Sequence, residues 1–426
     1  MTLRIQYSAL SIIESFTAMS DLRRVAIFSK EYPPYVYGGA GVHVEYLARE
    51  LARLVPVEVR CFGDQQSDEP NLRVRGYGLW DEMKQNTDPR FVGAVDAFAR
   101  SLAMAKDTLE ADVAHCHTWY SDMAGLLASQ LWGIPYVLTI HSLEPLRPWK
   151  VEQLGNGYYL SSWMERTAIE QADAIIAVSK ETKSDILRFF SIAPEKIHVI
   201  YNGIDLDQYR TAPATDALER YGVDPTRPFV LFVGRIARQK GIIHLVNAIP
   251  HIDPAIQVVL CAGAPDTPEI ADEMRAGVAA VSATRPDVIW IQAMLARPDV
   301  IQFYSHATVF CCPSVYEPFG IINLEAMACE TAVVASAVGG IKEVVVPEET
   351  GVLVDLQLKP GTFDPVDPAA FSSDLAAAIN RVANDAELRA RFGKAGRKRV
   401  EDHFSWTAIA QQTLELYETL VRERRT

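Results

Sequence analysis

The sequence of 426 residues lacks several features that would assign it to a class at once. It has no uninterrupted apolar run of about 18 residues, which a membrane-spanning helix requires, so we expect no membrane partner. It also has no excess of positive charge, because 41 Lys and Arg face 54 Asp and Glu and the net charge is −13. Non-specific nucleic-acid binding depends on neutralising phosphates with Lys and Arg, so we expect no nucleic-acid partner. No low-complexity tract and no repeat of fixed period is present.

Cysteine is scarce as well. The six cysteines have no zinc-ligand spacing and form no dense framework. Four of them, Cys116, Cys261, Cys311 and Cys312, lie in apolar, strand-like runs. We therefore expect buried, reduced thiols and a cytoplasmic location.

Two short patterns resemble metal sites but are interpreted otherwise. His115-Cys-His117 offers two histidines on one face of a strand, but the sequence shows no further ligand cluster beside them. Asp205-Leu-Asp207 resembles the D-x-D metal motif of another transferase class, but it falls in a linker between domains. We predict no metal and no other cofactor.

The first 20 residues do not match the rest of the chain. Glu14 interrupts their apolar stretch and no small-residue cleavage site follows, so a signal peptide is not predicted. Met19 precedes the first convincing strand. We expect residues 1–20 to be either an N-terminal extension, disordered and dispensable for folding, or the product of an upstream start codon chosen in error.

Apolar strands alternate with amphipathic helices along the whole chain. In the first half, strands are predicted at 24–28, 57–61, 113–116, 136–140, 174–178 and 198–200. In the second half, they are predicted at 229–233, 257–261, 288–292, 309–312 and 332–335. Continuously apolar strands separated by helices are typical of a parallel sheet that is covered on both faces.

The chain is too long for one ordinary core, and a linker rich in turn residues separates the two series of strands. We predict an acceptor-side domain over 21–205 and a nucleotide-sugar-binding domain over 206–404. A helix over 405–426 is expected to pack back toward the first domain. The fold class is α/β, with two doubly wound domains that face each other across an active-site cleft.

A segment that follows the strand at 309–312 carries two carboxylates. Glu325 follows Glu317 by eight residues. We predict that Pro318 lies in the first turn of a helix, with Glu317 at its mouth and Glu325 inside it. Eight residues of helix rise about 12 Å, which exceeds the separation of about 5–9.5 Å between the paired carboxylates of a glycoside hydrolase. The expected helix N-terminus near Phe319 favours a phosphate group.

Two glycine-containing loops follow strands. Gly234-Arg-Ile-Ala-Arg-Gln-Lys-Gly241 places Arg235 and Lys240 at one helix entrance, where both can bind phosphate oxygens. Tyr37-Gly-Gly-Ala-Gly41 is a strand-to-helix loop through which a backbone can approach a phosphate or a sugar closely. It is not G-x-G-x-x-G, so a nicotinamide cofactor is not predicted.

A third loop begins directly after the strand at 136–140. His141 stands at the carboxyl end of that strand, and Arg147 and Lys150 follow in the same loop. These two cations could bind an anion on the acceptor side of the cleft, although solvated loop charges would leave the same pattern.

From Arg23 onward the chain resembles the retaining glycosyltransferases of the glycogen synthase and sucrose synthase type. These are family 4-like enzymes with two facing Rossmann-like domains, the GT-B architecture. Residues 317–325 match the E-x7-E element of the family, residues 234–240 match its pyrophosphate-binding element, and residues 38–39 match its glycine loop. The segments 30–43 and 141–150 are most similar to the actinobacterial members of the glycogen synthase group, some of which make α-maltose 1-phosphate.

The resemblance implies a role for each matching residue. The implied donor contacts are Gly38, Gly39, Arg235, Lys240, Met294, Glu317, Phe319, Gly320, Ile321 and Glu325. The residues implied to act in catalysis are Glu317, His141, Arg235 and Lys240. The acceptor side is assigned to Tyr37, His117, Arg147 and Lys150.

The implied reaction is metal-independent transfer of glucose from ADP-glucose or UDP-glucose, with retention, to form an α-1,4 link. Arg147 and Lys150 favour glucose 1-phosphate as the acceptor, which gives α-maltose 1-phosphate. The alternative is a glycogen synthase that elongates an α-glucan, although the lysine of the K-x-G-G-L loop of longer bacterial glycogen synthases is absent here. A transferase with another sugar or acceptor is the second alternative, and a non-catalytic sugar-nucleotide-binding protein is the third. The sequence leaves open the nucleobase and the oligomeric state, for which a homodimer is one candidate.

Overall fold

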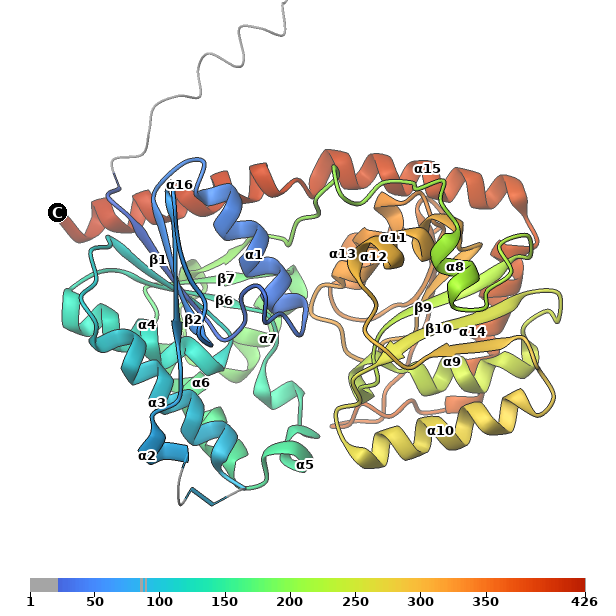
Figure 1. Ribbon diagram of the computed structural model, residues 1–426, viewed down its shortest axis with the longest axis horizontal. Coiled ribbons are helices and arrows are strands. Elements are labelled where there is room, and N and C mark those ends of the chain that lie inside the picture. Colours follow the sequence, from blue (N-terminus) through green and yellow to red (C-terminus); the bar gives the residue numbers. More distant parts are fainter. Residues whose placement is uncertain (1–21, 85–86, 89, 426) are drawn as a thin grey trace, which may run out of the picture.

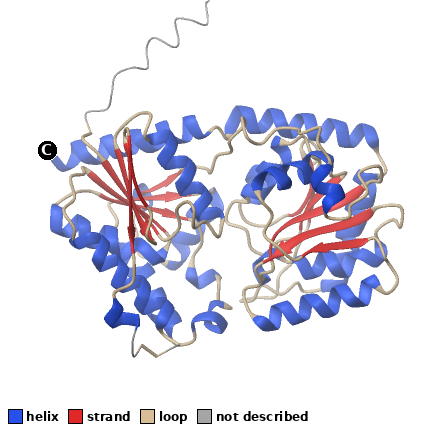
Figure 2. Cartoon of the chain, viewed as in Figure 1, coloured by secondary structure: helices blue, strands red, loops and turns tan. Residues whose placement is uncertain are grey.

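The computed structural model describes residues 22–84, 87–88 and 90–425, which form two sheet-centred halves side by side (Figure 1). The extension expected over residues 1–20 lies outside the described residues. Each half consists of a central sheet with helices on its faces, as the secondary-structure colouring shows (Figure 2). The α/β prediction with two doubly wound halves is confirmed.

The N-terminal half contains an eight-stranded sheet in the order β3-β4-β2-β1-β5-β6-β7-β8, parallel except for β3. Its strands are β1 (Val25–Ser29), β2 (Val57–Phe62), β3 (Gln66–Glu69), β4 (Leu72–Tyr77), β5 (Val113–His117), β6 (Tyr136–Ile140), β7 (Ala174–Ala177) and β8 (Ile197–Val199). Its helices are α1 (Gly39–Leu51), α2 (Asp81–Lys84), α3 (Val92–Lys106), α4 (Trp119–Trp132), α5 (Lys150–Leu154), α6 (Gly157–Gln171) and α7 (Lys180–Phe189).

The C-terminal half contains a six-stranded, fully parallel sheet in the order β11-β10-β9-β12-β13-β14. Its strands are β9 (Phe229–Arg235), β10 (Gln257–Gly263), β11 (Val288–Ile291), β12 (Val309–Cys312), β13 (Val333–Ser336) and β14 (Gly351–Val354). The remaining helices are α8 (Asp216–Arg220), α9 (Ile242–Ala248), α10 (Pro268–Ser282), α11 (Arg297–His306), α12 (Ile321–Ala328), α13 (Ile341–Val344), α14 (Pro368–Ala383), α15 (Ala386–His403) and α16 (Trp406–Arg425).

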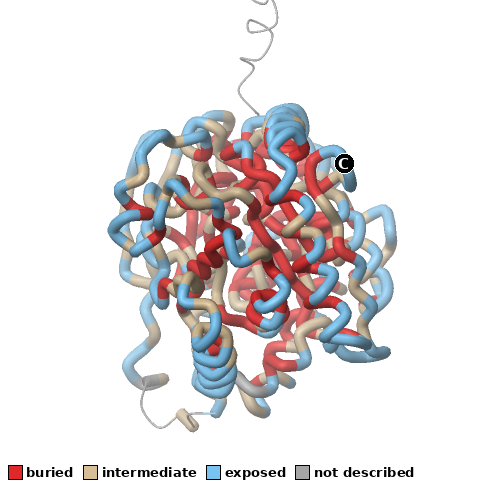
Figure 3. Tube along the Cα trace, turned by 90° about the vertical axis from the view of Figure 1, so that its right-hand side faces the viewer, coloured by how far each residue is buried: buried red, intermediate tan, exposed pale blue. Residues whose placement is uncertain are grey.

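Each sheet has a hydrophobic core on both faces, because its central strands are buried throughout (Figure 3). In β1, Ala26 and Phe28 pack into one core while Val25 and Ile27 pack into the other. All six cysteines are free and buried, as expected from their apolar surroundings. Among the described residues, no helix has both the length and the apolar composition that crossing a membrane requires.

The last helix returns to the first half of the chain. In Figure 1, α15 runs along the C-terminal half and α16 continues along the N-terminal half. Trp406 and Tyr417 of α16 are buried in the same core as Val25 and Ile27 of β1. The two chain segments that cross between the halves lie side by side, because the Ile204 amide donates to the Phe404 carbonyl at 2.9 Å.

The strand order fixes where a ligand can bind. In the first sheet the chain runs outward from β1 in both directions, so β1 and β5 form a switch point, and in the second sheet β9 and β12 do the same. Ligands of open parallel sheets bind in the crevice at the carboxyl ends of the strands at such a point.

Candidate active site

The chemically distinctive residues follow the strands at these two switch points. Tyr37 and Gly38 lie between β1 and α1, which begins at Gly39, so the loop predicted over 37–41 is shorter than expected; His117 ends β5. Arg235 ends β9, and Glu317 follows β12. The two sets meet between the halves, where Arg235 Nη1 donates to the Tyr37 hydroxyl at 3.2 Å and its guanidinium lies 4.7 Å from the Tyr37 ring centroid.

Glu317 and Lys240 form a largely buried ion pair. Lys240 Nζ donates to Glu317 Oε2 at 2.5 Å, and the side chains are 15% and 9% exposed. The Ser314 hydroxyl donates to the same oxygen at 3.3 Å. The pair therefore holds both side chains in one arrangement at the carboxyl ends of β9 and β12.

The backbone of Glu317 is held by a close approach of two glycines. The Gly340 amide donates to the Glu317 carbonyl at 2.9 Å. A Cβ at Gly339, whose φ is +50°, would lie 2.0 Å from that carbonyl oxygen. Only glycine fits so close to another backbone, so this contact fixes the position of Glu317.

The expectation that Pro318 opens a helix is wrong. Residues 317–320 are not helical, and α12 begins at Ile321 after Gly320, whose φ is +100°. The left-handed conformation of Gly320 sets the start of the helix, and Gly339 and Gly340 hold the preceding segment. Glu317 therefore lies in a loop, and the expected 12 Å rise along one helix does not apply. Phe319 is buried with its ring stacked on Tyr201, so only its backbone can face the cleft.

Glu325 lies inside α12 and is held by two tyrosines. Tyr209 donates to Oε1 and Tyr304 donates to Oε2, each at 2.9 Å. Burial raises the pKa of Glu325, while these hydrogen bonds and the positive charges of Arg297 and Lys240 oppose the rise. A carboxylate fixed in this way can accept hydrogen bonds from hydroxyl groups of a ligand.

Arg235 is matched by an acidic partner. It forms a short ion pair with Asp266, and the two side chains are 16% and 4% exposed. Each of the two predicted phosphate-binding cations, Arg235 and Lys240, is therefore already paired with a carboxylate. These pairings orient both cations before any ligand arrives.

The glycine loop is organised by Glu31. One oxygen of its carboxylate accepts hydrogen bonds from the amides of Tyr37 and Gly38 at 2.7 and 2.8 Å. A Cβ at Gly39 would lie 3.6 Å from Ile321 Cδ1 at the start of α12. The predicted Gly38 and Gly39 thus lie opposite the start of α12, with the Gly38 amide already bonded to Glu31.

The loop after β6 is supported by buried acids. The Glu144 amide donates to both carboxylate oxygens of Glu165, at 3.0 and 3.1 Å, and both side chains are buried. Burial is the main cause that raises the pKa of Glu165, and the neighbouring Glu144 charge adds to it. The Arg147 guanidinium donates to Ser142 Oγ at 3.0 Å, which ties the loop together.

Two cations of the N-terminal half, Lys30 and Lys150, lie within electrostatic range of Arg235. Burial, with the positive charges of Arg147 and Arg235, lowers the pKa of Lys150 to about 8, although Asp266 and Glu144 oppose this. Burial also lowers the pKa of Lys30, on which Arg235 acts in the same direction. Lys30 Nζ lies 3.8 Å from the centroid of the Tyr120 ring. These four residues, Lys30, Arg147, Lys150 and Arg235, form a basic cluster across the cleft.

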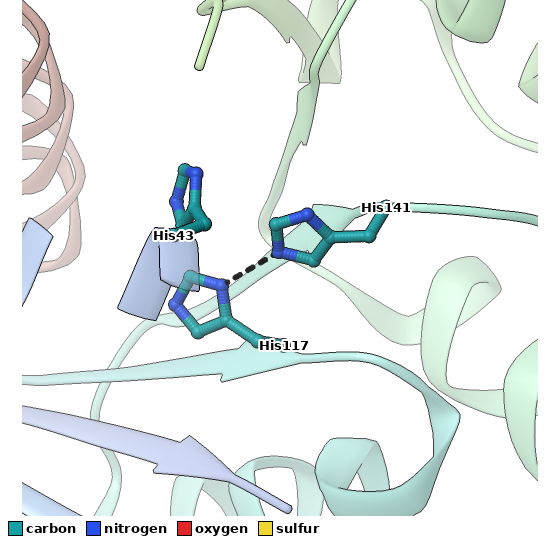
Figure 4. A group of neighbouring side chains, drawn as sticks. All are labelled: His43, His117 and His141. Atoms are coloured by element: carbon teal, nitrogen blue, oxygen red, sulfur yellow. Dashed lines mark hydrogen bonds between the residues drawn. The ribbon is translucent and has the colours of Figure 1, made fainter. Parts of the chain in front are cut away.

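His141 lies in a group of histidines (Figure 4). His117 Nδ1 is 3.1 Å from His141 Nε2. The ring of His43, from α1, lies 5.2 Å from the His117 ring, to which it is tilted, and 4.7 Å from the His141 ring, to which it is edge-on. One ring nitrogen from each of the three lies within 4.8 Å of the others. The expectation that His117 has no further ligand-type neighbours is therefore wrong, because its neighbours come from distant segments. His117 itself is fully buried in the wall behind His141.

Comparison with known proteins now adds to this geometry. Two family models match the chain. The model described as "Glycosyltransferase Family 4" matches residues 37–208, and the model described as "Glycosyl transferases group 1" matches residues 215–399. An α-maltose-1-phosphate synthase from Mycolicibacterium smegmatis is 48% identical over 402 residues, which are 92% of this chain and 98% of that protein. The chain belongs to glycosyltransferase family 4.

Two further relatives of this family 4 glycosyltransferase bear on its fold and substrates. A glycogen synthase from Mycobacterium tuberculosis is 28% identical over 422 residues, covering 92% of this chain and 94% of that protein. The structure of sucrose-phosphate synthase from Thermosynechococcus elongatus matches with a TM-score of 0.76 and 28% identity, covering 94% of this chain and 100% of the other. The predicted GT-B architecture is confirmed.

The remaining predicted residue, Met294, is 59% exposed in the loop after the edge strand β11. Sequence reasoning missed several residues that shape the site in this family 4 enzyme. They are Glu31, His43, Asn202, Tyr209, Asp266 and Tyr304. Glu31 could have been found, because it lies two residues after β1 at a switch point. The dismissed pattern at Asp205 has a structural role, since Asp205 accepts a hydrogen bond from Arg49 at 2.8 Å.

Proposed function

We propose that this chain is a retaining α-1,4-glucosyltransferase that transfers glucose from ADP-glucose or UDP-glucose to glucose 1-phosphate and so forms α-maltose 1-phosphate. Two observations support this proposal. The relative with this activity in its name is 48% identical over 92% of the chain. In addition, Arg147 and Lys150 lie across the cleft from the predicted donor site, where an acceptor phosphate would need them.

In the proposed mechanism, the bond between the glucosyl C1 and the diphosphate oxygen breaks as the acceptor 4-hydroxyl forms a new bond to C1 from the same face. Negative charge then accumulates on the diphosphate. Arg235 and Lys240, already held in fixed positions, stabilise this charge, and such preorganised electrostatic stabilisation is commonly the largest contribution to catalysis. The hydroxyl proton passes to a leaving phosphate oxygen, so no enzymic nucleophile is needed.

The other predicted residues have positioning roles in this proposal. Glu317 faces the sugar and offsets the positive charge that develops on its ring. Glu325, held by two tyrosines, accepts hydrogen bonds from the ribose hydroxyls. His141 lies beside the transferred sugar at the end of β6.

Product analysis tests the proposal directly. The protein is incubated with radiolabelled ADP-glucose or UDP-glucose and with either glucose 1-phosphate or glycogen, and the product is identified by mass spectrometry and NMR. We expect α-maltose 1-phosphate and little incorporation into glycogen. Incorporation into glycogen alone would show an elongating synthase, and transfer to neither acceptor would contradict the proposed substrate.

The acceptor site is tested by Arg147→Ala and Lys150→Ala together. Each charge-assisted hydrogen bond to a phosphate contributes about 1.5–3 kcal/mol, so the KM for glucose 1-phosphate should rise by roughly 100-fold or more while the donor KM changes little. Lys342→Ala is a matched control, because that side chain is 46% exposed and pairs with Glu181. An equal rise in both KM values would refute the assignment of the acceptor site.

A further inference from the structure

We propose that His43, His117 and His141 form a binding site for a transition-metal ion such as Zn²⁺ in the N-terminal wall of the cleft. The three rings come from α1, from the end of β5 and from the loop after β6, and they converge on one another (Figure 4). One nitrogen from each ring lies within 4.8 Å of the other two.

The spacing is close to what a small tetrahedral ion needs. Zinc–nitrogen bonds of about 2.0–2.1 Å place two nitrogens of one tetrahedral site about 3.3 Å apart. His117 Nδ1 and His141 Nε2 are already 3.1 Å apart. The His43 nitrogen, within 4.8 Å of both, would have to move closer to complete a three-nitrogen set.

The hydrogen bond that His43 makes also leaves one of its ring nitrogens with a lone pair for an ion. His43 Nδ1 lies 2.6 Å from Asn202 Oδ1, and because an amide oxygen only accepts, Nδ1 carries the proton and Nε2 keeps its lone pair. His43 Nε2 is buried and makes no hydrogen bond with the described part of the chain. Metal-bound histidines commonly donate their other N–H to such an outer partner.

The neighbouring His115 is not part of the site. Its Nδ1 is 2.5 Å from the Tyr417 hydroxyl and its Nε2 is 2.7 Å from Thr139 Oγ1. His141 is the least buried of the three ligands. It gives an ion access from the cleft and leaves its fourth position to water or to a substrate atom.

Titration of the full chain with Co²⁺, followed by Zn²⁺ competition, tests the site. We expect one ion per chain with the visible absorption of four-coordinate Co²⁺. His43→Gln and His117→Gln should each weaken binding by about 100-fold or more, and Asn202→Ser by about 10–100-fold, the usual effect of losing an outer partner. The double variant His251→Gln/His403→Gln, at two exposed positions outside the group, should bind as the wild type does.

Unchanged affinity in the folded His43→Gln variant, or no stoichiometric endpoint with wild-type protein, would overturn the proposal. X-ray absorption of the Zn²⁺-loaded wild type needs no variant to fold, and it should show three imidazole ligands. Fewer than three would also overturn the site. These measurements use no sugar, so their outcome is independent of the proposed reaction. If His141 contacts the transferred sugar, as that reaction requires, Zn²⁺ should inhibit transfer with the same midpoint as binding.

Discussion

The two walls of the cleft differ in the side chains that they present. On the C-terminal side, Lys240 and Glu317 pair directly, and Gly339 and Gly340 fix the backbone of Glu317. On the N-terminal side, His43 and His141 come from segments far apart in the chain and meet only through the topology of the sheet. The first, charged wall is built around ion pairs, whereas the second presents buried histidines, and both are assembled from segments that are distant in the sequence.

This difference matches the needs of the proposed reaction. A diphosphate that gathers charge needs cations held in place, and the C-terminal wall supplies them already oriented by acidic partners. A neutral sugar needs shape and exclusion of water more than charge, and buried uncharged histidines supply these. The basic loop of Arg147 and Lys150 adds charge to the N-terminal wall only where an acceptor phosphate is proposed.

The largest expected effect comes from removing a cation of the charged wall. Lys240→Ala should lower kcat by about 100–1000-fold, because it removes a fixed charge opposite the developing diphosphate. Steady-state kinetics with the donor and glucose 1-phosphate measure this loss, and Lys342→Ala serves as the exposed control. A kcat within a few fold of the wild-type value would show that this wall does not stabilise the transition state.

The buried histidines of the N-terminal wall should make the protein less stable at acidic pH. Burial lowers the pKa of His43 to about 4 and that of His115 to about 3, from 6.5. Below 6.5 the unfolded chain binds protons that the folded chain does not, so the stability present above that pH falls as pH decreases toward the folded values. For each such histidine, the free energy of unfolding decreases by about 1.4 kcal/mol for every unit by which the pH falls between the unfolded and the folded pKa.

Urea unfolding of the wild type and His43→Gln from about pH 8 to about pH 5 measures this dependence. The variant should lose stability less steeply than the wild type below the ordinary pKa of histidine. Parallel curves would mean that His43 is not neutral in the folded state.

A third test separates backbone clash from backbone strain on the charged wall. Gly339 and Gly361 both have positive φ, +50° and +74°, but only at Gly339 would a Cβ meet another atom, the Glu317 carbonyl oxygen at 2.0 Å. Gly361→Ala should lose about 1 kcal/mol of stability and keep its kcat. Gly339→Ala should lose more stability and at least about tenfold in kcat, because Glu317 must move. Equal effects of the two changes in Tm and kcat would contradict the role of the glycine contact.

The smallest effect is expected from Glu165, which supports the loop after β6 that carries Arg147 and Lys150. Glu165→Leu removes the acceptor of the Glu144 amide, which costs about 1–3 kcal/mol and should raise the KM for glucose 1-phosphate by roughly tenfold. Glu165→Gln keeps an acceptor oxygen and should restore most of the affinity. If both variants behaved alike, or if the donor KM rose instead, Glu165 would not position the acceptor loop.

The sequence predicted most of the fold because its strands are buried on both faces. Every strand expected from an apolar run is present, with its ends shifted by at most two residues. The strands that were missed are β3, β4 and β14. β3, with the sequence Gln-Ser-Asp-Glu, is an exposed edge strand whose polar residues give no apolar signal.

The charged wall was also predictable, because its residues are close in sequence to strand ends and glycines. What escaped prediction depends on contacts between distant segments. Glu325 was identified, but the tyrosines that hold it come from the linker and from α11. Likewise, His117 was not expected to be a metal ligand, because His43 and His141 are its neighbours only in the folded chain.

The return of α16 to the first sheet makes the C-terminal half, in topological terms, an insertion within the N-terminal one. The host is interrupted after β8 and is completed only when α16 packs against β1 and α1. The inserted half is one continuous stretch of chain, so it should be separable as an autonomous unit. The host could be obtained alone only by joining the paired crossing points at Ile204 and Ser405 with a short linker.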